Sequence, residues 1–248
     1  MNRVIICLIA ICAGFTVNAA SSLTQLLEKN QASFAPVLPE KLLHGKVHIM
    51  DMSKNNAYFQ KVDIRSTKAL IDFGEAEKQG SGADLLIGRY LEDRNIYRRG
   101  SHYGNGEDER TVHLGIDLMA PAGTPIYAPL EGVVHSFKDN NIVADYGPTI
   151  ILSHRLAGHT FYTLYGHLGR ESLTGIKVGQ VIQKGAQIAT IGKPFENGGW
   201  PEHLHFQIIT EMQGEKGNYV GVISPRKVNA YTKLCPNPNL ILNIGALK

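Results

Sequence analysis

The sequence carries little excess charge of either sign. Its 248 residues include 25 Lys and Arg against 22 Asp and Glu, a formal net charge of +3 with histidine neutral. Because no long run of Lys or Arg appears either, we expect no nucleic-acid partner. Hydrophobic residues make up 43% and charged residues 19% of the chain, a balance that excludes a mostly disordered protein.

The apolar run at the N-terminus is short for a membrane-spanning helix. It occupies residues 4–17, whereas a spanning helix needs roughly 20 apolar residues. The run follows a positive charge at Arg3 and ends at Val17-Asn18-Ala19, a pattern that a signal peptidase reads. This order predicts a signal peptide over residues 1–19 and export to the periplasm, with secretion as the alternative location. Cleavage before Ala20 would leave no stable membrane anchor; an uncleaved anchor is the other interpretation.

Cysteine is scarce. Of the three cysteines, Cys7 and Cys12 lie in the predicted signal peptide, so the mature chain would keep only Cys235. This excludes an internal disulfide and a cysteine-based zinc site in the mature protein. We expect Cys235 to be a buried structural thiol, with an intermolecular bridge as the alternative.

Several familiar catalytic motifs are also missing. The chain has no Gly-x-Ser-x-Gly sequence for a serine hydrolase and no His-Glu-x-x-His helix of the thermolysin kind. Residues 185–193 superficially resemble a phosphate-binding loop, but the spacing is wrong. Pro194 also stands where a Ser or Thr would hold magnesium.

Glycine and proline, by contrast, are frequent, with 26 and 11 residues. They favour short strands and tight turns over a helical bundle. Short β-prone runs separated by turn signals occupy residues 112–118, 132–138, 149–155, 159–168, 186–191 and 203–209. We therefore predict a mainly β fold with an antiparallel sandwich or barrel-like core.

The rest of the chain is mixed and suggests an α+β extension before the core. We expect a short helix within residues 21–34 capped by Ser22, and a core that ends near Thr210. Further predictions are strands at residues 46–50 and 57–64, a helix at 83–90 and a loop at 101–110. These elements divide the chain into a signal peptide (1–19), an N-terminal region of unassigned role (20–100), a core domain (101–212) and a C-terminal extension (213–248).

Ten histidines are present, and the first of interest is His113, four residues before Asp117. On a straight strand the two residues share a face but lie roughly 13 Å apart. Ligands of one zinc ion must each lie about 2 Å from the metal, so the strand would have to bend between them. Gly115 is the residue that tolerates such a bend. A pair with this spacing is otherwise usually two unrelated surface residues.

Two further histidine clusters lie in β-prone runs. In His203-Leu204-His205, a period of two places both imidazoles on one face and Leu204 on the core side. In Tyr165-Gly166-His167-Leu168, the histidine follows an apolar strand, a position that is more often structural than catalytic. Spacing alone does not say which of His203 and His205 would bind a metal.

Together, the three clusters resemble the lysostaphin-type zinc endopeptidases, bacterial peptidoglycan hydrolases with a duplicated hybrid motif fold. The resemblance covers residues 110–209 and includes the surrounding stretches HLGIDLMAPAGTPIYAPLEGVV and YGPTIILSH. It implies that His113, Asp117 and His205 bind one zinc ion and that His167 and His203 are catalytic. It makes residues 101–212 a zinc endopeptidase domain, and its implied partners are the peptides of peptidoglycan.

The chemistry implied by the resemblance is consistent. Three protein ligands leave a fourth position of a tetrahedral zinc ion open for water, as in catalytic rather than structural sites. Zinc lowers the pKa of such a water to about 7. The two remaining histidines would then handle the proton or hydrogen-bond the oxyanion.

One residue departs from the family's pattern. Glu202 directly precedes His203, where the family usually has a small residue or proline. Its carboxylate would either hydrogen-bond the imidazole and raise its basicity or simply point to solvent, and we favour solvent.

Two other classes of protein stay open as alternatives. A non-catalytic relative would bind cell wall or activate another wall hydrolase, but such a protein would be expected to lose zinc ligands. A phosphocarrier of the same fold would use paired histidines, but it would leave Asp117 without a role and would meet no phosphate donor after export. Zinc content distinguishes the enzyme from both.

Overall fold

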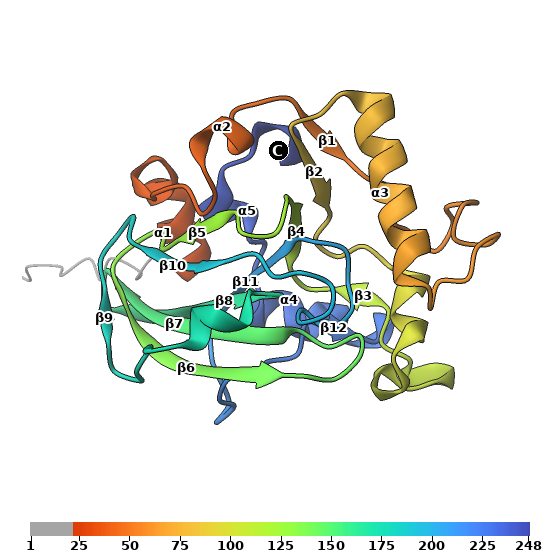
Figure 1. Cartoon of the computed structure of the whole chain (residues 1–248). Coiled ribbons are helices and arrows are strands. Elements are labelled where there is room, and N and C mark those ends of the chain that lie inside the picture. The colour runs from red at the N-terminus through yellow and green to blue at the C-terminus, as the bar shows by residue number, and fades with distance from the viewer. Residues whose placement is uncertain (1–21) are drawn as a thin grey trace, which may run out of the picture.

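The computed structural model describes residues 22–248; the predicted signal peptide, with Cys7 and Cys12, lies outside the described residues. The main feature is an eight-stranded sheet (Figure 1). In spatial order its strands are β1 (Val47–Ile49), β2 (Leu85–Gly88), β4 (Ile116–Met119), β11 (Leu204–Ile209), β8 (His159–Gly166), β7 (Gly147–Leu156), β6 (Gly132–Asn140) and β9 (Val181–Ile182).

Pairing in this sheet is antiparallel throughout except between β1 and β2, which run parallel. Two smaller ribbons complete the β structure. One pairs β5 (Pro125–Tyr127) with β10 (Gln187–Thr190), and the other pairs β3 (Val112–His113) with β12 (Val222–Ile223). The predicted mainly β class is therefore confirmed.

The main hydrophobic core lies on one face of the large sheet. Alternate residues of β11, Leu204, Phe206 and Ile208, are fully buried there, because successive side chains of a strand point to opposite faces. They share this core with Ile126 of β5 and Ala189 of β10. Figure 1 shows the β5–β10 ribbon lying over β7 and β8 as a second layer.

The opposite face carries a second cluster, to which the C-terminal part of the chain contributes. Tyr219, Ile223 and Cys235 are buried there against Leu164 and Ile209 of the sheet. The prediction that the core ends near Thr210 is therefore wrong. Cys235 is a buried free thiol, as predicted. Two short helices complete this end of the chain, α4 (Val228–Leu234) and α5 (Asn239–Leu242).

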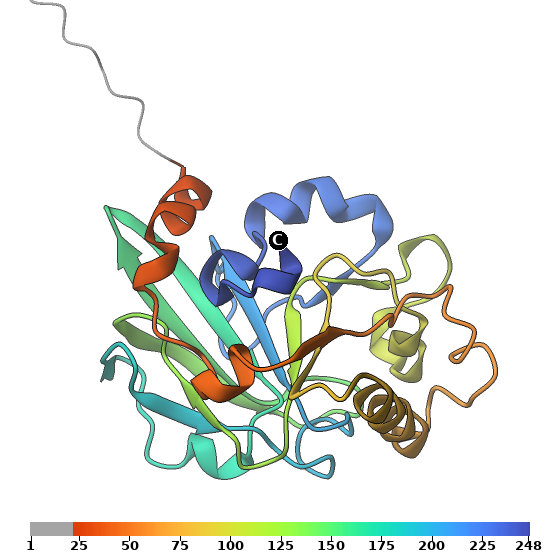
Figure 2. The same ribbon diagram turned by 90° about the horizontal axis from the view of Figure 1, so that it is seen from above.

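The first helix, α1 (Leu23–Asn30), forms where the sequence predicts it. The Ser22 hydroxyl accepts a hydrogen bond from the Gln25 backbone N–H, and the Gln25 side chain accepts one from the Ser22 N–H, a complete capping box. Leu27 of α1 enters the main core, and α1 packs against α5. Figure 2 shows α1 at one end of the molecule and α3 at the other.

Two expectations about residues 20–100 differ from the structure. Residues 83–90 contain the strand β2 instead of a helix. This strand is buried on both faces between β1 and β4, so its apolar run lacks the alternation typical of exposed strands. Residues 57–64 form consecutive turns instead of a strand.

The largest helix, α3 (Thr67–Ser81), was not predicted at all. The Ser66 hydroxyl caps its start by accepting from the Ala69 N–H, and Gly82 ends it in the left-handed region at φ 62°. A further one-turn helix, α2, covers Glu40–Leu43. Among the described residues, no helix has the length and apolar character needed to span a membrane.

Candidate metal centre

Strand register brings the first two candidate ligands together. Asp117 of β4 lies directly opposite His205 of β11, and Gly166 of β8 lies opposite His205 on its other side. Because Leu204 and Phe206 face the main core, His205 points to the other face of the sheet.

His113 reaches the same point through the predicted bend. The chain leaves β3 after His113, and β4 begins at Ile116, so the two strands pair with different neighbours. Gly115 lies in the bend, and a Cβ atom there would be 2.4 Å from Cε1 of His205. The site therefore requires glycine at this position.

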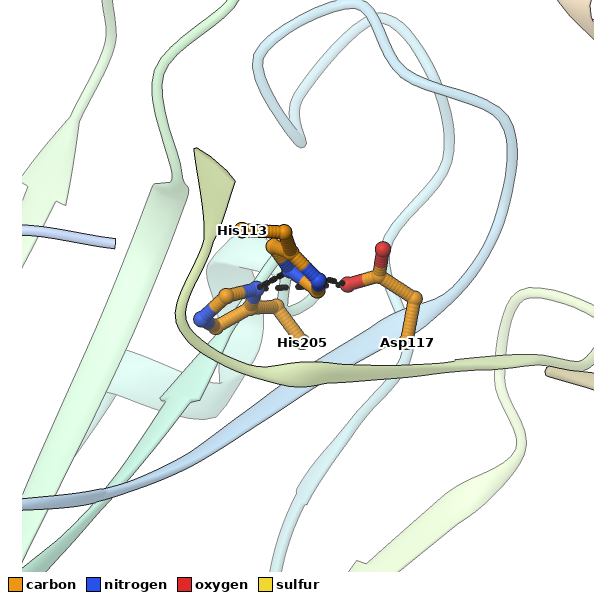
Figure 3. Close-up of side chains that lie close together, drawn as sticks. All are labelled: His113, Asp117 and His205. Carbon is orange, nitrogen blue, oxygen red and sulfur yellow. Dashed lines mark hydrogen bonds and ion pairs between the residues drawn. The ribbon is translucent and has the colours of Figure 1, made fainter. Parts of the chain in front are cut away.

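The three donor atoms form a tight triangle (Figure 3). Nε2 of His113 lies 2.9 Å from Nδ1 of His205, and Oδ1 of Asp117 lies 3.2 Å from each of these nitrogens. Ligand atoms about 2.0 Å from a tetrahedral ion are separated by about 3.3 Å. The triangle therefore has the dimensions of a zinc site.

Hydrogen bonds on the outer side of each imidazole assign its proton. Nδ1 of His113 donates to the carbonyl of Arg89 at 2.9 Å, and Nε2 of His205 donates to Oε1 of Gln207 at 3.1 Å. The amide nitrogen of Gln207 is engaged by the Val220 carbonyl, which fixes the amide orientation. Each imidazole then presents a bare nitrogen to the triangle. Three lone-pair donors this close repel one another unless a cation lies between them, so the donor set fits a metal ion.

The other two histidines stand beside the triangle. The rings of His167 and His203 lie 4.2 Å apart between centroids, and Nε2 of His203 lies 3.7 Å from Oδ1 of Asp117. Their Nδ1 atoms donate to backbone carbonyls of Asn197 (2.8 Å) and Pro201 (2.7 Å). Both Nε2 atoms are therefore unprotonated acceptors. His167 adopts φ 63°, a strained conformation for a residue other than glycine.

Burial affects the pKa values of His113, His167, His203 and Asp117. Burial lowers the pKa of His113 to about 4, and it also lowers the pKa of His203. Burial and the neighbouring His203 and His205 hold the pKa of His167 well below its usual range. Burial would raise the pKa of Asp117, but His113 and Arg94 outweigh it and keep this carboxyl ionised. At pH 7 the site therefore combines the carboxylate of Asp117 with neutral imidazoles at His113, His167 and His203.

Aromatic rings enclose the site, which lies in a cavity of about 460 Å³. The ring of Tyr146 packs 5.0 Å from that of His205, and Trp200 lies 6.2 Å from His167. Tyr97 covers the His113 side at 6.3 Å. These rings lower the local polarity around the site, which strengthens electrostatic interactions among its polar groups.

Two further findings concern residues near the site. Arg94 is fully buried, and its guanidinium contacts the Oδ2 atom of Asp117 at 2.6 Å. No sequence pattern predicts this contact, because a charged run such as Glu92-Asp93-Arg94 is more typical of a solvent-exposed segment. Glu202 neither contacts the His203 imidazole nor simply points to solvent, as we favoured. Its carboxylate accepts the Ala122 backbone N–H at 2.7 Å, so it secures the turn after β4.

Fold and site together define a β-sheet protein with a buried His-Asp-His cluster that could hold a metal ion. Residues 111–220 match the model of peptidase family M23, so this part of the chain is similar to an M23 peptidase domain. This family is one of metallopeptidases, and it implies a metal ion at the site.

Curated relatives align with less than half of the chain. The peptidoglycan DD-endopeptidase ShyC of Vibrio cholerae is 33% identical over 98 residues, which cover 40% of this chain and 20% of the relative. The DD-carboxypeptidase/endopeptidase Mpg of Neisseria meningitidis is 31% identical over 114 residues, covering 46% and 23%. The chain thus spans about a fifth of the length of these relatives.

Among solved structures, the catalytic domain of lysostaphin from Staphylococcus simulans is 24% identical. That match covers 50% of this chain and 83% of the lysostaphin domain, with a TM-score of 0.36.

Proposed function

We propose that the protein is an exported zinc-dependent endopeptidase that hydrolyses peptide bonds in the stem or cross-bridge peptides of peptidoglycan. The observation that carries the proposal is the triangle of His113, Asp117 and His205, with its bare donor atoms 2.9–3.2 Å apart. These residues would hold one zinc ion per chain. The M23 domain and its peptidoglycan-hydrolysing relatives support the substrate class.

The centre would work as follows. When bound, zinc supplies Lewis acidity and lowers the pKa of water to about 7. His167 and His203 face the same volume with unprotonated Nε2 atoms. One of them would accept the proton of the attacking water, donate a hydrogen bond to the oxyanion as an imidazolium and then deliver that proton to the leaving amine, while the other would accept a hydrogen bond from the water and orient it. Their Nδ1 bonds to backbone carbonyls keep both rings in this orientation.

The charges at the site support the role of the zinc ion as a Lewis acid and of His167 and His203 as proton acceptors. Asp117 is the single anion among the three donors, so a bound zinc ion would keep a net charge of +1 and remain an effective Lewis acid. The low pKa values of His167 and His203 keep both imidazoles unprotonated near neutral pH, as a general base requires.

Digestion of purified sacculi tests the proposal. The protein that begins at Ala20 is incubated with directly cross-linked and with pentaglycine-bridged sacculi, and the products are identified by mass spectrometry. We expect shorter or uncross-linked muropeptides with intact glycan strands, loss of activity with a zinc chelator and recovery on addition of zinc. Cleavage of glycan, or no product while zinc is bound, would contradict the proposal. The second outcome would favour a non-catalytic wall-binding or activating role.

A further inference from the structure

The charged side chain most deeply buried beside the centre is that of Arg94, and all of its hydrogen bonds are made to neighbours of the site. Only 1% of this side chain is exposed. Its Nη1 atom donates to Oδ2 of Asp117 at 2.6 Å and to the Tyr97 hydroxyl at 3.2 Å, and its Nε atom donates to Oε2 of Glu92 at 2.9 Å. The guanidinium of Arg94 therefore binds Oδ2, the carboxylate oxygen of Asp117 that faces away from the two imidazoles.

The same short segment anchors a second donor. The backbone carbonyl of Arg89 accepts from Nδ1 of His113 at 2.9 Å and from Nη2 of Arg94 at 3.2 Å. One carbonyl thus fixes both the imidazole of His113 and the guanidinium that holds Asp117. Two of the three donors depend on residues 89–94, which begin the connection from β2 to the short strand β3.

Glu92 completes the support of the guanidinium. Its side chain is 2% exposed, and its Oε1 atom accepts from Nη2 of Arg89 at 2.7 Å and from the Met52 backbone N–H at 3.1 Å. Its other oxygen bonds Arg94, so the buried cation lies between two carboxylates. Gly88 makes room for this arrangement, because a Cβ there would lie 2.6 Å from Nη2 of Arg94 and 3.0 Å from Oδ2 of Asp117.

We propose that Arg94 is a positioning residue of the metal centre and that residues 88–94, which precede the M23 match, form its outer support. This inference rests on the proposed function. With Oδ2 engaged by the guanidinium, Asp117 presents only Oδ1 to the metal. The charge-assisted hydrogen bond also draws electron density from the carboxylate, so the metal retains more of its Lewis acidity.

The test removes the buried charge pair as a unit. The variant Glu92→Gln/Arg94→Met leaves no unpaired Glu92 carboxylate in the interior. A matched control, Arg98→Met/Glu109→Gln, removes another Arg–Glu pair that does not touch the centre. In this pair the exposed Arg98 places its Nε atom 2.7 Å from Oε1 of Glu109. Zinc affinity is measured by competition with a chelating dye, and the visible absorption of the Co²⁺-loaded protein reports the coordination.

We expect zinc affinity to fall by about 10–100-fold in the Glu92→Gln/Arg94→Met variant and to stay unchanged in the control. The Co²⁺ absorption should weaken in the former, because a freed Oδ2 allows a second carboxylate contact and a higher coordination number. If this variant does not fold, Arg94→Lys replaces it: its single ammonium keeps the charge but not the guanidinium fork, and both readouts should change in the same direction.

A folded variant with wild-type zinc affinity and a wild-type Co²⁺ spectrum would overturn the assignment of Arg94 while leaving the proposed function intact. Failure of the wild-type protein itself to bind zinc would overturn the proposed function and this assignment with it.

Discussion

Each imidazole of the centre is held by a hydrogen bond on the side that faces away from it. A backbone carbonyl fixes the ring of His113, His167 and His203, and a side-chain amide fixes that of His205. Because these acceptors bind the protonated nitrogen, the other nitrogen of every ring is left as a lone-pair donor. The chemistry of the site is thus decided by contacts outside it.

The first prediction at this scale separates proton handling from metal binding. His167→Ala and His203→Ala should each retain one zinc ion, because neither residue contributes an atom to the triangle. Turnover of sacculi should fall on the order of 10²–10⁴-fold if each imidazole acts as an acid–base group. His159→Ala, a change at a half-buried histidine on β8 remote from the triangle, serves as the control. Near-normal turnover in both variants would assign the pair a structural role.

The second prediction concerns a histidine outside the centre. His154 of β7 is buried between the Glu131 carbonyl (2.9 Å) and the Thr163 hydroxyl (2.7 Å), and burial lowers its pKa to about 4. The unfolded chain takes up this proton near pH 6.5, so the stabilisation is complete above that pH and is lost as pH falls towards 4. The loss should be on the order of 3 kcal/mol.

Urea denaturation of the zinc-free protein at pH 7 and pH 4 measures this effect. The variant His154→Gln should show a smaller loss of unfolding free energy between the two pH values than the wild type, and His159→Gln should show the same loss. Equal pH dependence in the wild type and His154→Gln would show that His154 does not carry the effect.

At the scale of elements, the local hydrophobic pattern predicted the strands that have one face in the core. It did not predict β2, which is buried on both faces, or α3, whose ends are set by capping residues. The runs at residues 132–138, 149–155, 159–168 and 203–209 alternate or are bounded by turns, and they form β6, β7, β8 and β11. β2 lacks alternation because it is an interior strand, and α3 owes its ends to Ser66 and Gly82 rather than to a strong apolar stripe.

The bend between β3 and β4 gives the prediction at this scale. Gly115→Ala should place a Cβ 2.4 Å from Cε1 of His205, so the imidazole must move out of the triangle. We expect a loss of about 1–3 kcal/mol in unfolding free energy from overpacking and a clear loss of zinc affinity. Gly80→Ala is the matched control, since nothing lies within 4 Å of a Cβ at that helical position. Calorimetry measures the unfolding free energy, and chelator competition measures the zinc affinity. Unaltered zinc affinity in Gly115→Ala would contradict the geometric argument.

At the scale of the whole molecule, the centre is assembled from segments far apart in the sequence. Strands β1 and β2, which precede residue 100, belong to the same sheet as β4 and β11, and residues 88–94 contact two of the three donors. The motifs predicted which side chains meet, because the resemblance supplied their roles. The support from Arg94 was not predictable, since a buried ion pair across 23 residues leaves no local pattern in the sequence.

Export is the prediction that concerns the whole chain. The charge at Arg3, the apolar run and Val17-Asn18-Ala19 predict a mature protein that begins at Ala20 or within a few residues of it. N-terminal sequencing of the protein from an extracytoplasmic fraction measures this directly. Intact Met1 on that protein would favour the uncleaved anchor instead.

The measurement that tests the central claim most directly is the metal content of the wild-type protein and four single variants, determined by elemental analysis after purification in zinc. The wild type and His203→Ala should each contain one zinc ion per chain, and His205→Ala should contain none, because His205 supplies one of only three protein ligands. His113→Ala and Asp117→Ala should behave like His205→Ala. Zinc retained by His205→Ala but lost from His203→Ala would reverse the roles of the two histidines, and no zinc in the wild type would contradict the account.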